Sequence, residues 1–229
     1  GIVIWNLGAG VSLTGLNLVD YALTVLWVVG ITNAFNLLDN MDGLAAGVAS
    51  IACVSYFAIA VTGDQGFVAT LSAGVIGCAV GFLRSNRYPA QIYMGDGGSL
   101  FLGFLVAYLG LKLKVAGDGY QTFLVPLLVC LIAIVDTTVV VVSRLRSGKS
   151  PFQGGQDHIS HRLVHVGLPV PIAVGVIHLA VLVVGALAFV CTRVDAASVW
   201  IVGGLAGVSA LGATVFFLAI PIYAEDRPS

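Results

Sequence analysis

The stretch NAFNLLDNMDGLAAG, residues 33–47, decides how the rest of the chain is interpreted. It joins a long apolar run to a cluster of three Asn and two Asp, with Gly43 after them. Asp39 and Asp42 lie three apart, so they share one face, about one turn from each other, if the preceding helix continues. Two carboxylates this close repel, and they stay ionised only beside a cation, a proton or a donor-rich ligand.

A plain helix end, with Gly43 as its C-terminal stop, is the structural alternative for this stretch. Two acids at a helix C-terminus are unfavourable because that end already carries partial negative charge. Acids at a membrane boundary are also costly, which favours a functional site. Carboxylate and amide oxygens are ligands that suit Mg²⁺.

The composition around this stretch is that of a polytopic, all-α membrane protein. Hydrophobic residues make up 59% and charged residues 9% of the sequence, whereas charged residues alone are about a quarter of a soluble domain. The net charge of −1 and the lack of a dense basic region exclude nucleic acid as a partner.

The opening apolar run, residues 2–11, is too short to cross a hydrocarbon core, which needs about 20 helical residues. We expect it to be half of a span, and the sequence to lack the N-terminal part of a longer protein. Residues 1–229 are read as a single membrane domain with no repeat. Runs of spanning length predict about seven full transmembrane helices: 19–38, 44–61, 67–83, 99–115, 123–142, 170–190 and 197–223.

The Lys and Arg residues fall unevenly on the two sides of this predicted bundle. Lys112, Lys114 and Arg193 lie on one side, and seven basic residues lie on the other. The positive-inside rule places the second side in the cytoplasm, together with all the polar clusters. The seven residues are Arg84, Arg87, Arg144, Arg146, Lys149, Arg162 and Arg227.

A second polar cluster, RSNRYPAQIYMGDGGS, covers residues 84–99. Pro89 breaks the helix, a Gly-rich turn follows, and Ser99 is expected to cap the next helix. Backbone N–H groups at a helix start hold anions, and Asp96 among them suggests a metal that bridges to phosphate. A plain loop is the structural alternative.

A third cluster, RLRSGKSPFQGGQDHISHRL, covers residues 144–163. Its basic residues either hold a diphosphate or anchor the loop to anionic lipid. His158 and His161 stand three apart in a chain with four His in all. Two further polar residues lie within predicted spans: Asp136 belongs to the site or pairs with another helix, and His178 is taken as structural.

The motifs NAFNLLDNMDGLAAG, IYMGDGGSLFLG and DHISHRL, in this order, resemble those of the polyprenyl-phosphate N-acetylhexosamine-1-phosphate transferases. That family comprises bacterial inner-membrane enzymes and eukaryotic relatives. The resemblance implies an Mg²⁺-dependent (or Mn²⁺-dependent) transfer of a sugar-1-phosphate from a UDP-sugar to undecaprenyl or another polyprenyl phosphate, with release of UMP. DHISHRL looks more like the branch that transfers GlcNAc-1-phosphate. A homodimer is compatible with the Gly-rich helices, in which residues 77 and 81 and residues 203 and 207 have GxxxG spacing.

The resemblance also implies roles for individual residues. Asn36 and Asp96 are expected to hold the metal, and Asp96 is expected to act in catalysis with Asp39 and Asp42, which line the nucleotide and metal pocket. Tyr93 is expected to stack on uracil. The other substrate contacts are expected from Asn33, Asn36, His158, His161 and Arg162.

This sequence departs from the family pattern in three places. The family's early pair of adjacent Asp is absent from these 229 residues. Asn40 stands where the family has Gly. The family also has a His-rich loop, which corresponds here to DHISHRL, residues 157–163, and is called the His loop below. Ser160 stands where that loop often has a further His. Two other functions are therefore kept open. One is a non-catalytic remnant that binds nucleotide or lipid. The other is a transporter, which would place polar residues near mid-span and show an inverted repeat.

Overall fold

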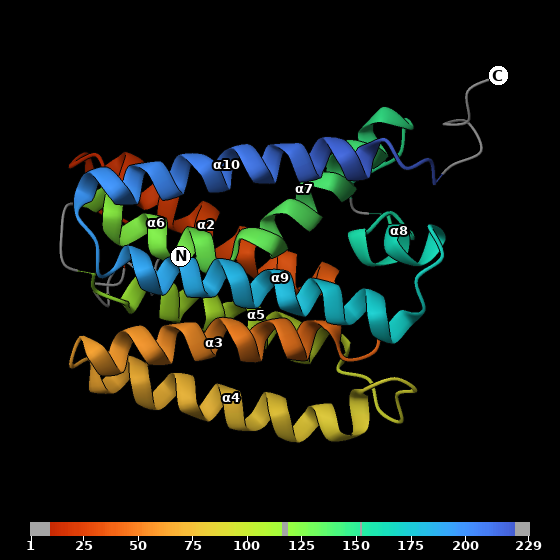
Figure 1. Ribbon diagram of the computed structural model, residues 1–229, viewed down its shortest axis with the longest axis horizontal. Coiled ribbons are helices and arrows are strands. Elements are labelled where there is room, and N and C mark those ends of the chain that lie inside the picture. The colour runs from red at the N-terminus through yellow and green to blue at the C-terminus, as the bar shows by residue number, and fades with distance from the viewer. Residues whose placement is uncertain (1–9, 116–118, 152, 223–229) are drawn as a thin grey trace.

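The computed structural model describes residues 10–115, 119–151 and 153–222, and these residues form helices and connecting loops with no strand (Figure 1). The predicted half-span at 2–11 lies almost wholly outside the described residues, as do Tyr223 and Arg227. The helices are α2 (Asn17–Leu38), α3 (Leu44–Thr62), α4 (Gly66–Asn86), α5 (Gly95–Lys112), α6 (Gly119–Val129), α7 (Leu131–Arg146), α8 (Ile159–His165), α9 (Val170–Cys191) and α10 (Ala196–Leu218).

Five of the described helices, α2, α3, α4, α9 and α10, are long and apolar enough to cross a membrane. This is the architecture of a multi-pass membrane protein, in which each span satisfies its own backbone hydrogen bonds. α5 lies beside α2, but it carries Asp96 at its start and Lys112 at its end and does not reach the same hydropathy. The predicted number of spans therefore stays a prediction.

The predicted continuous helix over 123–142 is wrong, because two helices occupy this region. α6 and α7 meet at Cys130 and are bent by 65°, and together they make at most one further span. Cys130 itself has φ −93° and ψ 3°, outside the helical region. The sequence carried one signal of an interruption, Pro126 within α6, because a Pro inside a helical run removes a backbone hydrogen bond and favours a kink.

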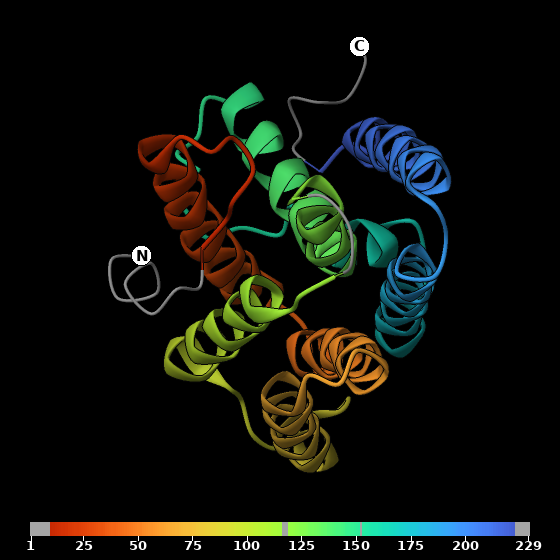
Figure 2. The same ribbon diagram turned by 90° about the vertical axis from the view of Figure 1, so that its left-hand side faces the viewer.

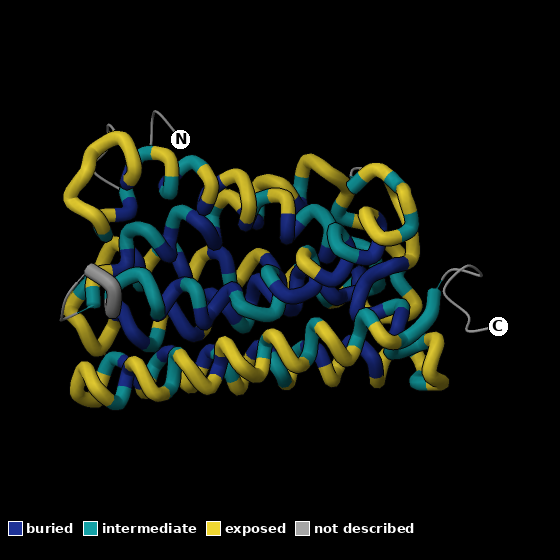
Figure 3. Tube along the Cα trace, turned by 90° about the horizontal axis from the view of Figure 1, so that it is seen from above, coloured by how far each residue is buried: buried dark blue, intermediate teal, exposed yellow. Residues whose placement is uncertain are grey.

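α3 is the central helix, with α4, α5 and α9 packed around it (Figure 2). In its spanning window 72% of residues are buried, against 6% in α10 at the edge of the bundle. Figure 3 shows this gradient, with buried residues in the middle and exposed residues along the outer helices. Exposed apolar side chains on the outer helices are what a lipid-facing surface requires.

One of the two pairs of glycines with GxxxG spacing takes no part in helix packing within the described chain. A Cβ on Gly77 or Gly81 would meet nothing within 4 Å, so this pair does not mark a contact within the chain. By contrast, a Cβ on Gly47 in α3 would overlap the imidazole of His178 in α9. The Nε2 of that ring lies 3.3 Å from the Leu44 carbonyl oxygen, which confirms the structural role predicted for His178.

Substituting Gly47 tests this contact. Gly47→Ala is expected to destabilise the detergent-solubilised protein by about 1–3 kcal/mol, because the new methyl group must displace a packed ring. The measurement is thermal unfolding. Gly77→Ala is the matched control and is expected to be neutral or slightly stabilising, because Ala favours a helix by up to about 1 kcal/mol over Gly.

The double variant Gly47→Ala/His178→Ala is expected to recover part of the loss, since it removes the ring that the methyl group meets. Equal stability of Gly47→Ala and Gly77→Ala would show that α3 and α9 do not pack as described.

Candidate functional site

The polar clusters meet at one end of the bundle, where α2, α4, α7 and α10 end and α3, α5 and α9 begin (Figure 1). This confirms that the three motifs share one face of the protein. At the other end, the Gln65 side chain bonds to both backbone groups of Lys114, with N–O distances of 2.7 Å, and so closes a turn.

The turn between α2 and α3 separates the two acids of the first motif. The helix ends at Leu38, and the Asp39 N–H bonds to the Asn36 carbonyl oxygen at 3.3 Å. Asp39 and Asp42 therefore do not share a helical face, because the helix needed for that relation stops before either of them. Gly43 has φ +75°, a left-handed conformation that Gly adopts without strain, and it begins α3.

Asp42 and Asn86 fasten this turn to the α4–α5 loop. Asp42 Oδ2 accepts a hydrogen bond from the Ala90 N–H at 2.9 Å. Asn86, which is 3% exposed, accepts from the Gly43 N–H at 3.0 Å and donates to the Ile92 carbonyl oxygen at 2.9 Å. Sequence reasoning missed Asn86, although its place in a polar cluster at the end of an apolar helix was a signal.

Asn36 and Asp96, 60 residues apart in sequence, are joined as the resemblance implies. Asn36 Nδ2 donates to Asp96 Oδ1 at 3.1 Å and to Ser99 Oγ at 2.9 Å. Ser99 does not cap α5 as expected, because that helix already begins at Gly95. Its hydroxyl lies within the first turn and donates to the Gly95 carbonyl oxygen at 3.1 Å. Asn33 stays outside this group and donates to the Val29 carbonyl oxygen of its own helix.

Asp39 lies close enough to Asp96 for the two charges to interact. Burial raises the pKa of Asp39, hydrogen bonding to the backbone of Gly95 lowers it, and the charge of Asp96 raises it further. A cation between the two carboxylates would relieve this repulsion. Asn36 uses its amide nitrogen for the bonds above, so its oxygen has no partner among the described residues.

These groups fit Mg²⁺, which is commonly held by one or two carboxylates, with water and substrate phosphate as its other ligands. Within the described part of the chain, no three His, Cys, Asp or Glu side chains gather to form a complete metal cage. A partly open site of carboxylate and amide oxygens is therefore the only kind of cation site that these residues support.

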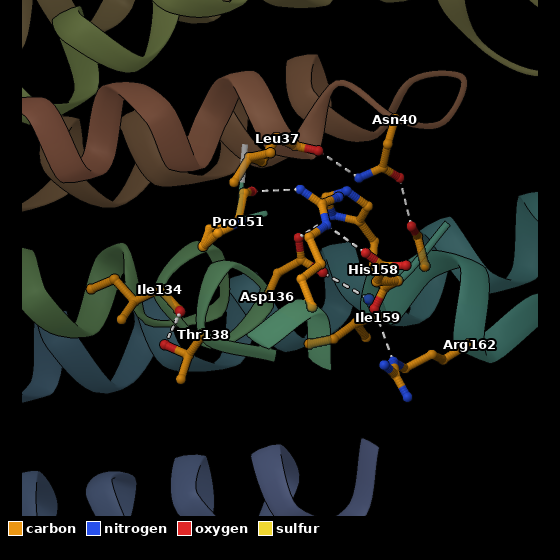
Figure 4. A network of polar contacts seen from close by, with 12 residues as sticks. Leu37, Asn40, Ile134, Asp136, Thr138, Pro151, His158, Ile159 and Arg162 are labelled. Carbon is orange, nitrogen blue, oxygen red and sulfur yellow. Dashed lines mark hydrogen bonds and ion pairs between the residues drawn. The ribbon is translucent and has the colours of Figure 1, made fainter. Parts of the chain in front are cut away.

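The His loop is anchored to α7 by a second polar group. Asp136 Oδ2 lies 2.8 Å from His158 Nδ1, and Asp136 Oδ1 accepts from the Ile159 N–H at 2.7 Å. Ser160 Oγ donates to Asn40 Oδ1 at 2.6 Å and links α8 to the turn after α2 (Figure 4). The ring of His161 lies 6.1 Å, centroid to centroid, from that of His158. The loop thus lies beside the first motif.

Two arginines predicted to face a ligand or lipid are buried instead. Arg144, 2% exposed, forms an ion pair with Asp157 at 2.5 Å and donates to the Pro151 carbonyl oxygen. Arg162, also 2% exposed, donates to Ser143 Oγ and to the carbonyl oxygens of Asp157, Phe217 and Ile220. Its guanidinium fastens the ends of α8, α7 and α10 together. A substrate contact for Arg162 stays a prediction, and these bonds give it a structural role.

The remaining predicted residues lie on exposed parts of the same end. Tyr93 is 78% exposed, just before α5, so one ring face is accessible to a ligand. Asp96 is also exposed, and Arg84 and Arg87 are exposed at the end of α4. The structure therefore gathers Asn36, Asp39 and Asp96 in one place, with His158 and His161 on the neighbouring loop.

The amino-acid sequence of this apolar helical bundle matches a known protein family. Residues 4–114 match glycosyl transferase family 4, and over that stretch the chain is a member of the family. The match includes the first two motifs, and the His loop lies beyond it. The resemblance drawn from the motifs is thereby confirmed.

Three individual relatives show which curated proteins the chain is similar to. The chain is 40% identical over 159 residues to a probable undecaprenyl-phosphate N-acetylglucosaminyl 1-phosphate transferase of Bacillus subtilis, covering 69% of this chain and 44% of the relative. It is 31% identical over 164 residues to a decaprenyl-phosphate N-acetylglucosaminephosphotransferase of Mycolicibacterium smegmatis, covering 63% and 40%. A phospho-N-acetylmuramoyl-pentapeptide-transferase of Heliobacterium modesticaldum is 46% identical over 91 residues, covering 40% and 28%. The chain thus spans less than half the length of each relative.

The buried ion pair between Arg144 and Asp157 allows a test of how the His loop is held against α7. Arg144→Met is expected to destabilise the protein by about 3–5 kcal/mol, because it leaves the Asp157 carboxylate buried without its partner. The double variant Arg144→Met/Asp157→Asn is expected to be more stable than the single one, since it removes both charges of this pair. Thermal unfolding in detergent measures both. A double variant that is less stable than the single variant would contradict this account.

The pKa of His161 predicts that the stability of the folded protein depends on pH. Burial, and then the neighbouring His158, lowers this pKa below its ordinary value of 6.5, while Asp136 and Asp157 act in the opposite direction. The unfolded chain therefore binds the proton more tightly. The stability from the neutral ring is fully present above pH 6.5 and is lost as pH falls through the lowered pKa.

His161→Gln is accordingly expected to flatten the fall in unfolding temperature between about pH 7.5 and pH 5. His165→Gln, on the exposed side of the same helix, is the matched control and should leave the slope as in the unmodified protein. Identical slopes for the two variants would refute the assignment to His161.

Proposed function

We propose that this chain is the core of a polyprenyl-phosphate N-acetylhexosamine-1-phosphate transferase. It transfers a sugar-1-phosphate, GlcNAc-1-phosphate in our proposal, from a UDP-sugar to undecaprenyl or another polyprenyl phosphate and releases UMP. The observation that carries the proposal is the group formed by Asn36, Asp39 and Asp96 at one end of an apolar bundle. The activities for which the bacterial relatives are named support it.

The position of the site suits the two substrates. A polyprenyl acceptor lies in the membrane with its phosphate at the interface, and a nucleotide sugar is soluble, so they meet only where a bundle ends. In the reaction, an oxygen of the lipid phosphate attacks the sugar-bearing phosphorus. A new P–O bond forms, the bond to the bridging oxygen breaks, and UMP leaves with that oxygen. Catalysis of this kind is mostly positioning and charge neutralisation.

The described residues supply these two effects. Asn36 and Asp96 would hold Mg²⁺, which when bound neutralises charge on the diphosphate. Asp39 lies beside them and completes the acidic pocket. Asp42 acts through the Ala90 N–H and holds the α4–α5 loop, so that Tyr93 can take uracil on its exposed ring. Stacking on an aromatic face is a sequence-tolerant way to hold a flat base.

The His loop contributes to the same pocket in this proposal. His158 and His161 would contact the diphosphate or the sugar, because the bond between Ser160 and Asn40 keeps α8 next to the acidic turn. Arg84 and Arg87, which are exposed at this end, add positive charge for an anionic donor.

We place the protein in the bacterial plasma membrane, with the site on the cytoplasmic side, where nucleotide sugars are made. The excess of Lys and Arg at the site end supports this orientation. The reaction would begin the synthesis of a cell-envelope polysaccharide. A homodimer is part of the proposal only as a prediction from the Gly-rich helices.

Two alternatives are distinguished by their chemistry. A transporter needs polar residues along a path near mid-span, whereas the acids named above gather at one end. A non-catalytic binder of nucleotide or lipid would keep the same pocket and lack turnover, so an assay of product decides between it and the enzyme.

The test is incorporation of radiolabel from UDP-GlcNAc into lipid by membranes that contain the product of the complete reading frame encoding this chain. Labelled lipid and UMP are expected with Mg²⁺ and not with a chelator. Asp96→Asn is expected to lower the rate by about 100-fold, because it removes a charge from the proposed metal ligands. UDP-MurNAc-pentapeptide and other UDP-sugars, tested in parallel, identify the donor.

Asp195→Asn is the matched control, since this carboxylate caps α10 at the end away from the site and Asn caps a helix as well as Asp does. It is expected to retain full activity. If well-expressed protein transfers no label from any of these donors, the transferase assignment fails and the non-catalytic binder becomes the better description.

A further inference from the structure

Asp136 is a buried carboxylate in an apolar helix, and its surroundings must account for its presence. It is 2% exposed and is the sixth of the 16 residues of α7. An ionised carboxylate without partners in such a place costs far more than a protein can recover, so it must be paired. Its partners come from the His loop and not from another spanning helix.

Both carboxylate oxygens of Asp136 are engaged, and one of the bonds has a fixed direction. The Ile159 N–H can only donate, so Asp136 Oδ1 is the acceptor in the 2.7 Å bond. This bond sets the plane of the carboxylate and aims Oδ2 at His158 Nδ1, 2.8 Å away. Figure 4 shows the ring of His158 between Asp136 and the turn that carries Asn40.

The second bond has a consequence for the proton on the ring. An ionised carboxylate has no hydrogen to give, so the proton between the two groups resides on His158 Nδ1. The other ring nitrogen, Nε2, makes no hydrogen bond to the described residues. In the described chain, the buried side-chain nitrogen and oxygen atoms that lack a hydrogen-bond partner are Thr32 Oγ1, Ser72 Oγ and Thr137 Oγ1. His158 Nε2 is not one of them.

The other charged groups near His158 are already engaged or are on its own loop. Asp157 precedes it and pairs with Arg144. His161 lies one turn further along α8, with its ring 6.1 Å away. Asp136 is therefore the acid that bonds directly to the His158 ring.

We infer that Asp136 is a positioning residue that holds the proton of His158 on Nδ1, so that the lone pair of Nε2 faces the substrate and can accept a proton from one of its phosphate groups. This inference rests on the proposed function for the identity of the substrate. The arrangement of the two side chains is independent of it. A carboxylate that fixes the tautomer and orientation of a His is a recurrent device in phosphate and acyl transfer.

Asp136→Asn separates this role from simple support of α8. The amide oxygen can still accept from the Ile159 N–H, while an NH₂ group replaces the oxygen that faces the ring. Because that NH₂ group donates, His158 Nδ1 must now accept, and the ring proton moves to Nε2. The start of α8 is kept and the tautomer is inverted.

The experiment combines histidine nitrogen NMR with kinetics on the product of the complete reading frame in detergent. The signal of His158 is assigned by its loss in His158→Gln. In the unmodified protein Nδ1 is expected to carry the proton, and in Asp136→Asn Nε2 is expected to carry it. In the transfer assay, Asp136→Asn is expected to lower kcat by about 100-fold with little change in KM. Asp136→Glu should keep the proton on Nδ1 and restore part of kcat.

Asp20→Asn is the matched control, because Asp20 is also buried in a spanning helix but bonds to Leu13 and Thr14 through a single oxygen that Asn retains. It should change neither the His signals nor kcat. The inference is overturned if His158 carries its proton on Nε2 alone in the unmodified protein, or if Asp136→Asn inverts the tautomer and leaves kcat unchanged. Absence of transfer by the unmodified protein would remove the catalytic part together with the proposed function, while the NMR result would still decide the arrangement. Should Asp136→Asn not fold, the spectra of the unmodified protein and Asp136→Glu decide.

Discussion

The structure depends on one constraint: a polar group that enters the apolar bundle must find its partner inside the protein. Asp136, Arg144 and Arg162 each meet this condition through bonds to other elements near one end of the bundle. Asn86 does the same for the α4–α5 loop. Polar side chains that would be solvated in a soluble protein thus connect helices here, and their hydrogen bonds give the loops at this end a defined conformation.

The apolar runs predicted most helices because hydropathy and length alone decide whether a segment can lie in lipid. The motifs also predicted the group of Asn36 with Asp96, which the chain brings together across 60 residues. The bend at Cys130 was missed: Pro126 within α6 signals a kink, but it sets neither the residue at which the next helix begins nor the angle between the two helices. The partners of Arg144 and Arg162 were missed in the sequence analysis. A basic residue near a membrane boundary has the same sequence context whether its side chain faces lipid, a ligand or a buried polar group.

The acids of the first motif differ in what they do, although they are three residues apart. Asp39 lies near Asp96, whose negative charge raises the pKa of Asp39. Asp42 instead accepts a hydrogen bond from the backbone N–H of Ala90. Helical spacing would have given them equal roles. The division arises because α2 stops at Leu38, so that Asp39 lies near the start of α5 and Asp42 bonds to the loop that precedes it.

The bonds from Arg162 to the carbonyl oxygens of Phe217 and Ile220 connect the outermost helix to the His loop. Only 6% of the spanning window of α10 is buried, so this guanidinium is a polar attachment of a helix that otherwise lies at the edge of the bundle. A movement of α10 within the bilayer is consequently transmitted through Arg162 to the loop that carries His158. A change in membrane thickness or lateral pressure that tilts α10 must either carry α8 with it or break two charge-assisted hydrogen bonds.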